Sequence, residues 1–218
     1  TLAGKRPKRI EIADLDLDGK PEVVLTSIGN NSVTVLVNQS TLGSISFSPI
    51  APISIVIPGA ASTEGLAVED LNGDNRPEIV TSQFPTNSDI YIISNLSSPG
   101  SIAAGPIRTI AVGTPIKNIR VGDLDGDRKP DIAYTKLTSS EVGLLLNQST
   151  PSTLNFSAAP SVVTDVTPWG IDFGDLDGDG KPDFIDSENQ ATTTVDDIFK
   201  NGNQKYWRVY LNTGSGFS

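Results

Sequence analysis

Four short acidic segments of this 218-residue sequence carry oxygen-bearing side chains at the same spacing. Each segment has a carboxylate or an amide at its first, third, fifth and ninth positions, and the segments begin 56, 53 and 52 residues apart. Such closely spaced carboxylates suit a hard cation that takes about six to eight oxygen ligands, which describes Ca²⁺. We therefore expect up to four Ca²⁺ ions, one per segment. The candidate side-chain ligands are Asp14, Asp16, Asp18 and Glu22; Asp70, Asn72, Asp74 and Glu78; Asp123, Asp125, Asp127 and Asp131; and Asp175, Asp177, Asp179 and Asp183.

The spacing also predicts the shape of each segment. Its first half is similar to the start of an EF-hand loop, in which the seventh residue contributes a backbone carbonyl. Because the last ligand comes at position 9 and not 12, we expect a turn between two strands. Position 6 would need a positive φ, which Gly19, Gly180 and Asn75 tolerate better than Arg128. The predicted carbonyl ligands belong to Lys20, Arg76, Lys129 and Lys181.

Asp-Gly-rich segments also make good hairpin turns without any metal. That alternative accounts for one such segment. It accounts poorly for four, because neighbouring carboxylates repel one another unless a cation neutralises them. In the second segment Asn72 replaces an Asp, so we expect weaker binding there.

The net charge of −10 comes mostly from these segments, which contain 15 of the 26 acidic residues. Four bound Ca²⁺ ions would bring the chain close to neutrality. The 16 basic residues form no surface suited to phosphates, so we expect no nucleic-acid partner.

Composition excludes several classes of function. The chain has no His and no Cys, which removes the usual general base, the thiol nucleophile and the best zinc ligands. Nearly every clustered carboxylate is already assigned to a metal turn, so we expect no enzymatic activity. No apolar run approaches the ~20 residues of a membrane span.

Alternating apolar residues precede each acidic segment, as in Ile10–Ile12 and Ile171–Phe173, and predict a half-buried strand. Two further strands follow each segment, and the second of them ends in an Asn. A fourth strand follows in the first three repeats, at residues 47–57, 107–112 and 156–163. The fold class predicted is all-β, with four-stranded antiparallel blades repeated around an axis, which is a β-propeller. The Asn residues that end the third strands, expected to form turns, are Asn38, Asn95, Asn147 and Asn212.

Residues 173–183, Phe-Gly-Asp-Leu-Asp-Gly-Asp-Gly-Lys-Pro-Asp, resemble the FG-GAP (or VCBS) repeat. This calcium-binding blade occurs in integrin α-subunit heads, some lectins and many bacterial surface proteins. The other three repeats keep the acidic segment but not the full Phe-Gly pair. The resemblance implies that the calcium turn joins the first and second strands, on the face away from the usual ligand surface.

The expected repeats span residues 1–57, 58–112, 113–163 and 164–218, and the last lacks its outer strand. Propellers have about four to eight blades, and the resemblance implies about seven. We therefore expect the chain to form part of a larger ring; a closed four-bladed ring is the alternative. The sequence starts without Met and has no signal peptide, so we expect a mature or excised piece. An incomplete ring would expose blade edges that favour self-association.

The fourth repeat has an insertion within residues 189–205, on the face that also carries Trp169. A long loop beside an exposed aromatic side chain could bind a sugar or a peptide. The alternative is a tolerated surface insertion, with Trp169 packed between blades. Glu11, Arg120 and Asp172 occupy matching positions on the inner strands, where we expect solvated charges of the central channel.

These features predict a secreted or cell-surface module for adhesion or recognition. Its partner would be a protein or a glycan, bound opposite the calcium turns. One alternative is a carbohydrate-binding, lectin-like module attached to a polysaccharide-acting enzyme. The other is a structural or assembly domain.

Overall fold

The computed structural model describes residues 6–29, 31–47, 53–58, 62–85, 88–164, 167–188 and 207–212. These residues form fifteen β-strands in four antiparallel sheets, and no helix occurs among them. The described part of the chain thus contains no helix that could cross a membrane.

Each sheet consists of strands that are consecutive in the sequence, and we call it a blade. Blade 1 contains β1 (Arg6–Ala13), β2 (Glu22–Ile28), β3 (Ser32–Leu36) and β4 (Ile53–Val56). Blade 2 contains β5 (Ser62–Glu69), β6 (Glu78–Phe84), β7 (Asp89–Asn95) and β8 (Ala104–Ala111).

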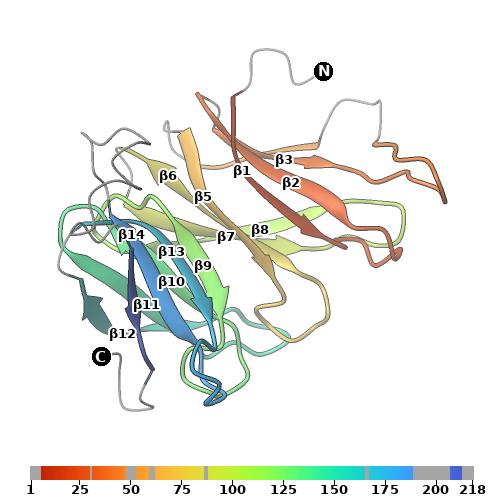
Figure 1. Ribbon diagram of the computed structural model, residues 1–218. Coiled ribbons are helices and arrows are strands. Elements are labelled where there is room, and N and C mark those ends of the chain that lie inside the picture. The colour runs from red at the N-terminus through yellow and green to blue at the C-terminus, as the bar shows by residue number, and fades with distance from the viewer. Residues whose placement is uncertain are drawn as a thin grey trace.

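The remaining blades repeat this order. Blade 3 contains β9 (Ile119–Gly122), β10 (Asp131–Lys136), β11 (Glu141–Asn147) and β12 (Phe156–Val163). Blade 4 contains β13 (Pro168–Gly174), β14 (Asp183–Glu188) and β15 (Trp207–Tyr210), so its described part has three strands. The four sheets follow one another in chain order, as Figure 1 shows. The predicted propeller blades and their up-and-down strand order are confirmed.

The first strands of successive blades contact each other, β1 with β5, β5 with β9 and β9 with β13. Because side chains of a strand alternate between its two faces, each blade packs one set against the preceding blade and the other against the next. In β7, for example, Tyr91 and Ile93 face blade 1, whereas Ile90 and Ile92 face blade 3. A blade therefore cannot bury both faces by itself.

Three apolar clusters lie at the three junctions between blades. Val33 and Val35 of blade 1 pack with Tyr91 of blade 2, and all three are almost fully buried. The second cluster joins blades 2 and 3. The third joins blades 3 and 4, where the rings of Phe184 and Tyr210 stack with their centroids 4.3 Å apart.

The predicted strands match the structure closely over the residues that it describes. For the fourth strand of blade 1 we expected residues 47–57; the structure has β4 from Ile53 to Val56, and residues 48–52 lie outside the described residues. Phe47 pairs separately with Asn38 in an isolated bridge. The insertion at 189–205 lies outside the described residues.

Candidate metal centres

The four acidic segments form the turns between the first and second strands of the four blades. Each turn is closed by the same register, in which the residue before position 1 pairs with position 9. These pairs are Ala13 with Glu22, Glu69 with Glu78, Gly122 with Asp131, and Gly174 with Asp183.

Backbone amides inside each turn donate to its carboxylates. In the third turn the amides of Gly126 and Arg128 donate to the two oxygens of Asp123, at 2.8 and 2.9 Å. The amide of Asp127 donates to Asp125, and the amide of Lys129 to Asp127. At position 7, Lys20, Arg76 and Lys181 donate in the same way to their own fifth-position carboxylates. These bonds hold the turn curled around the first carboxylate.

The curl needs positive φ at two positions. At position 6 the angles are as predicted, including 68° at Asn75 and 67° at Arg128. Position 4 also has positive φ, which we did not predict. Three turns have Gly there, but the first has Leu17 at 61°. The Gly residues at position 4 of the other three turns are the feature of the sequence that indicates this positive φ.

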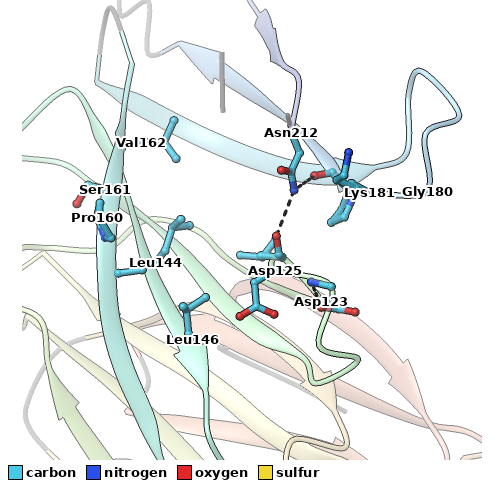
Figure 2. A pocket seen from close by; sticks show the side chains of 14 residues that line it. Asp123, Asp125, Leu144, Leu146, Pro160, Ser161, Val162, Gly180, Lys181 and Asn212 are labelled. Atoms are coloured by element: carbon cyan, nitrogen blue, oxygen red, sulfur yellow. Dashed lines mark hydrogen bonds between the residues drawn. The ribbon is translucent and has the colours of Figure 1, made fainter. Parts of the chain in front are cut away.

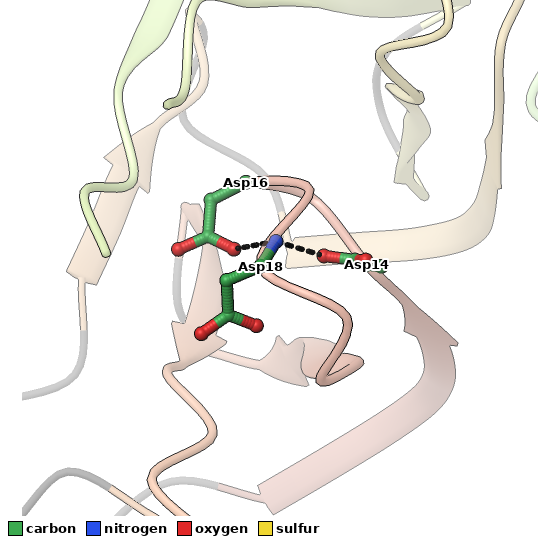
Figure 3. Close-up of side chains that lie close together, drawn as sticks. All are labelled: Asp14, Asp16 and Asp18. Atoms are coloured by element: carbon green, nitrogen blue, oxygen red, sulfur yellow. Dashed lines mark hydrogen bonds between the residues drawn. The ribbon is translucent and has the colours of Figure 1, made fainter. Parts of the chain in front are cut away.

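Carboxylate oxygens converge in three of the turns, where one oxygen from each of three residues lies within 4.8 Å of the others. Figure 3 shows Asp14, Asp16 and Asp18 around the first turn, with the amide of Asp18 donating to both other carboxylates. The groups are Asp14, Asp16 and Asp18; Asp123, Asp125 and Asp127; and Asp175, Asp177 and Asp183.

The fourth turn differs from the first and third in which of its carboxylates converge. Its group includes the ninth-position Asp183 in place of the fifth-position Asp179. The ammonium of Lys181 lies 2.6 Å from Asp179, and this hydrogen bond lowers the pKa of Asp179. In the second turn the side-chain amide of Asn72 donates to a carboxylate oxygen of Glu78 at 3.2 Å. This hydrogen bond occupies an oxygen that a metal would use.

The ninth-position carboxylates are fully buried and anchor the turn to the third strand. Asp131 accepts from the amides of Leu124 and Asn147, at 2.8 and 2.7 Å. Burial raises the pKa of Asp131 to about 6 and that of Glu78 to about 7, and nearby Asp residues of each turn add to the shift. Burial also raises the pKa of Glu22. A bound cation would oppose these pKa shifts, because it stabilises the ionised carboxylates.

The donor set fits a hard, oxygen-seeking cation. Carboxylate oxygens converge at one point, and the chain contains no His or Cys that would favour a softer metal. These residues are therefore suited to hold Ca²⁺.

In blades 2, 3 and 4, an Asn at the end of the third strand or two residues beyond it connects neighbouring turns. The Asn147 side-chain amide donates to the carbonyl of Pro130 in its own blade and to that of Leu71 in the preceding one, both at 2.8 Å. Asn95 and Asn212 make the same pair of bonds, to Leu15 and Leu124 of the preceding turns. The predicted turn role is confirmed at Asn38, Asn95 and Asn147, whose side-chain oxygens accept from the backbone amides two residues later. The bonds across the junctions were not predicted.

The first turn has a further contact from blade 2. The amide of Gly100, in the turn between β7 and β8, donates to Asp16 at 2.8 Å. Asp16 is buried, whereas the equivalent Asp125 and Asp177 are exposed. The centre in the first turn therefore lies at a junction between blades.

A cavity of about 670 Å³ lies between blades 3 and 4, beside Asn212 (Figure 2). Leu144, Leu146, Ala159 and Val162 supply its apolar wall. At the second junction, Leu154 and Phe156, from the start of the outer strand, pack onto the corresponding cluster. The cavity thus lies where an outer strand of blade 4 would pack.

Trp169 lies near the start of β13, so it is at the end of the strand away from the acidic turn. It is 40% exposed, and the ammonium of Lys117 lies 4.9 Å from its ring centre and 4.4 Å from that of Phe84. Lys117 and Lys8 both lie near the buried carboxylate of Glu64, at 3.4 and 3.7 Å. The indole is therefore partly packed at a blade junction and partly accessible.

The inner-strand charges that we predicted at matching positions lie near one another. Arg120 pairs with Asp172 at 3.2 Å. Burial raises the pKa of Glu11, and the nearby positive charge of Arg120 opposes that shift.

Repeated antiparallel sheets with an acidic turn between the first two strands define a β-propeller, and three of its turns bring together carboxylates that could hold a metal ion. The FG-GAP-like repeat model matches residues 14–81 and 123–185, which together are more than half of the chain. The chain belongs to the FG-GAP-like repeat family.

Two solved structures support the fold. The crystal structure of BBS1N in complex with ARL6DN, soaked with mercury, has a TM-score of 0.51 at 13% identity, covering 82% of this chain and 46% of that chain. The lead-soaked form has a TM-score of 0.52 at 12% identity, and the match covers 85% of this chain and 51% of that chain. This chain thus spans about half the length of the chains it matches. No curated protein matches it.

Proposed function

We propose that this chain is a calcium-stabilised propeller module for adhesion or recognition, and that it is not an enzyme. The observation that carries the proposal is the convergence of carboxylate oxygens within 4.8 Å in three equivalent turns. Carboxylates so close repel one another in the absence of a cation. Calcium bound only to the folded state would stabilise it by mass action, by about 2.7 kcal/mol at 100 times the dissociation constant.

The candidate ligands remain those predicted from the sequence, with one ion per turn. We expect the second turn to bind most weakly, because it has one carboxylate fewer and its Asn72 amide already engages Glu78. Open turns of this kind suit extracellular affinities of ~10⁻⁴–10⁻³ M. We therefore propose that the protein is secreted or on the cell surface.

Thermal unfolding in millimolar Ca²⁺, after removal of divalent cations, and in Mg²⁺ tests the proposal. We expect a large rise in melting temperature that is specific to Ca²⁺. The triple variant D175N/D177N/D179N should lose part of that rise. A matched control, D89N/E141Q/D172N, neutralises three carboxylates outside the turns and should keep it. No Ca²⁺-dependent shift in the unaltered protein would overturn the proposal.

The partner is proposed to be a protein that binds at the end of the blades opposite the acidic turns. FG-GAP propellers are generally binding or structural modules, and BBS1N, whose structure is similar to this one, was crystallised in complex with ARL6DN. Without His or Cys, and with most clustered carboxylates in the turns, the chain has few groups suited to catalysis.

A lectin-like module, as part of a polysaccharide-acting enzyme, is the second candidate function. The accessible indole of Trp169 favours it, because sugars stack on exposed aromatic rings and charged groups lie beside this one. Glycan binding measured by calorimetry should disappear in W169A and persist in W169F. Equal binding by W169A and the unaltered protein would exclude this site.

A further inference from the structure

The outward face of blade 1 exposes an apolar residue whose equivalents are buried in every other blade. Ile10 of β1 is 59% exposed. Its equivalents in the first strands of blades 2, 3 and 4 are Leu66, Ile119 and Ile171, and all are at most 3% exposed. Those three side chains belong to the clusters that join each blade to the preceding one. Blade 1 therefore presents the same half of a blade junction without its other half.

Blade 4 presents the complementary half. Leu176, at position 2 of its acidic turn, is 50% exposed, whereas the equivalent Leu15, Leu71 and Leu124 are at most 5% exposed. Val209 of β15 is also exposed, at 42%. The residues equivalent to Val209 are Val35, Ile92 and Leu144, which lie in the clusters that face the next blade.

The donor and the acceptor of the junction hydrogen bond are also separated, one on each of these two faces. At each internal junction an Asn amide donates to the carbonyl of the position-2 Leu in the preceding blade. The side-chain amide of Asn38 in blade 1 donates only to Pro21 among the described residues. No described residue donates to the carbonyl of Leu176. Asn38 is thus a donor, and Leu176 an acceptor, of one missing junction bond.

We propose that a second copy of this chain covers these faces, with blade 1 of one copy packed on blade 4 of the other. The contact continues the internal junctions: it has the same apolar positions, and Asn38 of one copy donates to Leu176 of the other. Within one chain the two faces are not joined, because Ile10 and Leu176 are both exposed. Such a head-to-tail contact uses two different surfaces, so it closes into a ring or extends as a chain of copies. This inference goes beyond the proposed recognition function and does not depend on it.

Cysteine cross-linking tests the arrangement cleanly, because the chain has no Cys of its own. A mixture of N38C and L176C, each folded with Ca²⁺, should form a disulfide-linked species of two chains. N38C alone, or L176C alone, should not. The double variant L71C/N147C tests the same geometry inside one chain and should form an internal disulfide. A disulfide between two N38C chains, or within a monomeric N38C/L176C chain, would overturn the proposal.

The mass in solution gives an independent test. Light scattering should show dimers or larger species of the unaltered protein. I10D/I12D and V209D/L211D change only exposed residues, so each should remain folded. Each should raise the dissociation constant at least about 100-fold, since burying an unpaired carboxylate is costly. Mixed together, the two variants should form a one-to-one dimer through their intact halves. A monomer at every concentration of the unaltered protein would overturn the proposal.

Discussion

The side-chain amide of Asn147 donates to the carbonyl of Leu71, 2.8 Å away and 76 residues earlier in the chain. Leu71 is the second residue of the acidic turn in blade 2, and the Asn147 backbone amide donates to the ninth-position Asp131 of blade 3. One residue thus connects two candidate metal turns. We expect this bond and its equivalents at the other two junctions to stabilise the packing of one blade on the next.

Replacing Asn147 with Ala should lower the free energy of unfolding by about 1–3 kcal/mol, because the buried carbonyl of Leu71 and the partly buried carbonyl of Pro130 lose their donor. Urea unfolding in Ca²⁺ measures the change. The matched control is N38A, measured at a protein concentration low enough to leave single chains, in which the Asn38 side-chain amide donates only to Pro21 among the described residues, at an exposed site. The decrease in the free energy of unfolding of N38A should be clearly smaller than that of N147A. Equal losses would show that the bond across the junction contributes nothing.

Gly143 of β11 is predicted to tolerate no side chain. A Cβ there would lie 2.2 Å from the ring carbon Cζ of Tyr134, which is buried. G143A should therefore destabilise the protein by about 1–3 kcal/mol through overpacking. The control is G122A, at the end of β9, where a Cβ would meet nothing within 4 Å. A melting temperature unchanged in both variants would contradict the packing described here.

Leu17 should be better replaced by Gly. Its φ of 61° is costly for a side chain with a Cβ, and the equivalent position is Gly in the other three turns. We expect L17G to raise the free energy of unfolding by a few tenths to about 1 kcal/mol, since the flexibility of Gly offsets part of the gain. L42G, at an exposed leucine without positive φ, should lower it. A loss of stability in L17G comparable to that in L42G would contradict the expectation.

Stability should depend on pH in opposite directions with and without Ca²⁺. Burial raises the pKa of Glu78 from 4.5 to about 7, so the folded state binds this proton more tightly than the unfolded state does. In the metal-free protein this contribution is complete below pH 4.5 and is lost as the pH rises to about 7. Asp131 acts likewise between pH 3.8 and about 6.

Melting temperatures of dialysed, metal-free protein should therefore fall across this window. In excess Ca²⁺ they should rise instead, because the cation binds the ionised carboxylates. E78Q removes the titrating group and should reduce the slope of the metal-free curve above pH 6, where Asp131 is already more than half ionised. A metal-free curve that rises towards pH 7 would mean that these carboxylates are already well solvated.

Much of the fold was determined by local sequence. Alternation of apolar residues predicted the strands, because side chains of a strand point to opposite faces and only some of them are buried. The acidic spacing predicted the turns and the oxygens that converge there, because ligands a few residues apart can reach one cation without help from distant segments. The positive φ at Asn75 and Arg128 followed from the same local geometry.

Tertiary structure decided the relationships between blades. The sequence marked Asn95, Asn147 and Asn212 as turn residues, but their bonds to Leu15, Leu71 and Leu124 depend on how one blade packs on the next. It also could not separate Leu176 from those three leucines, since all four occupy the same position in the motif. Their exposure differs because burial is set by the neighbouring blade, and at Leu176 that neighbour is not among the described residues.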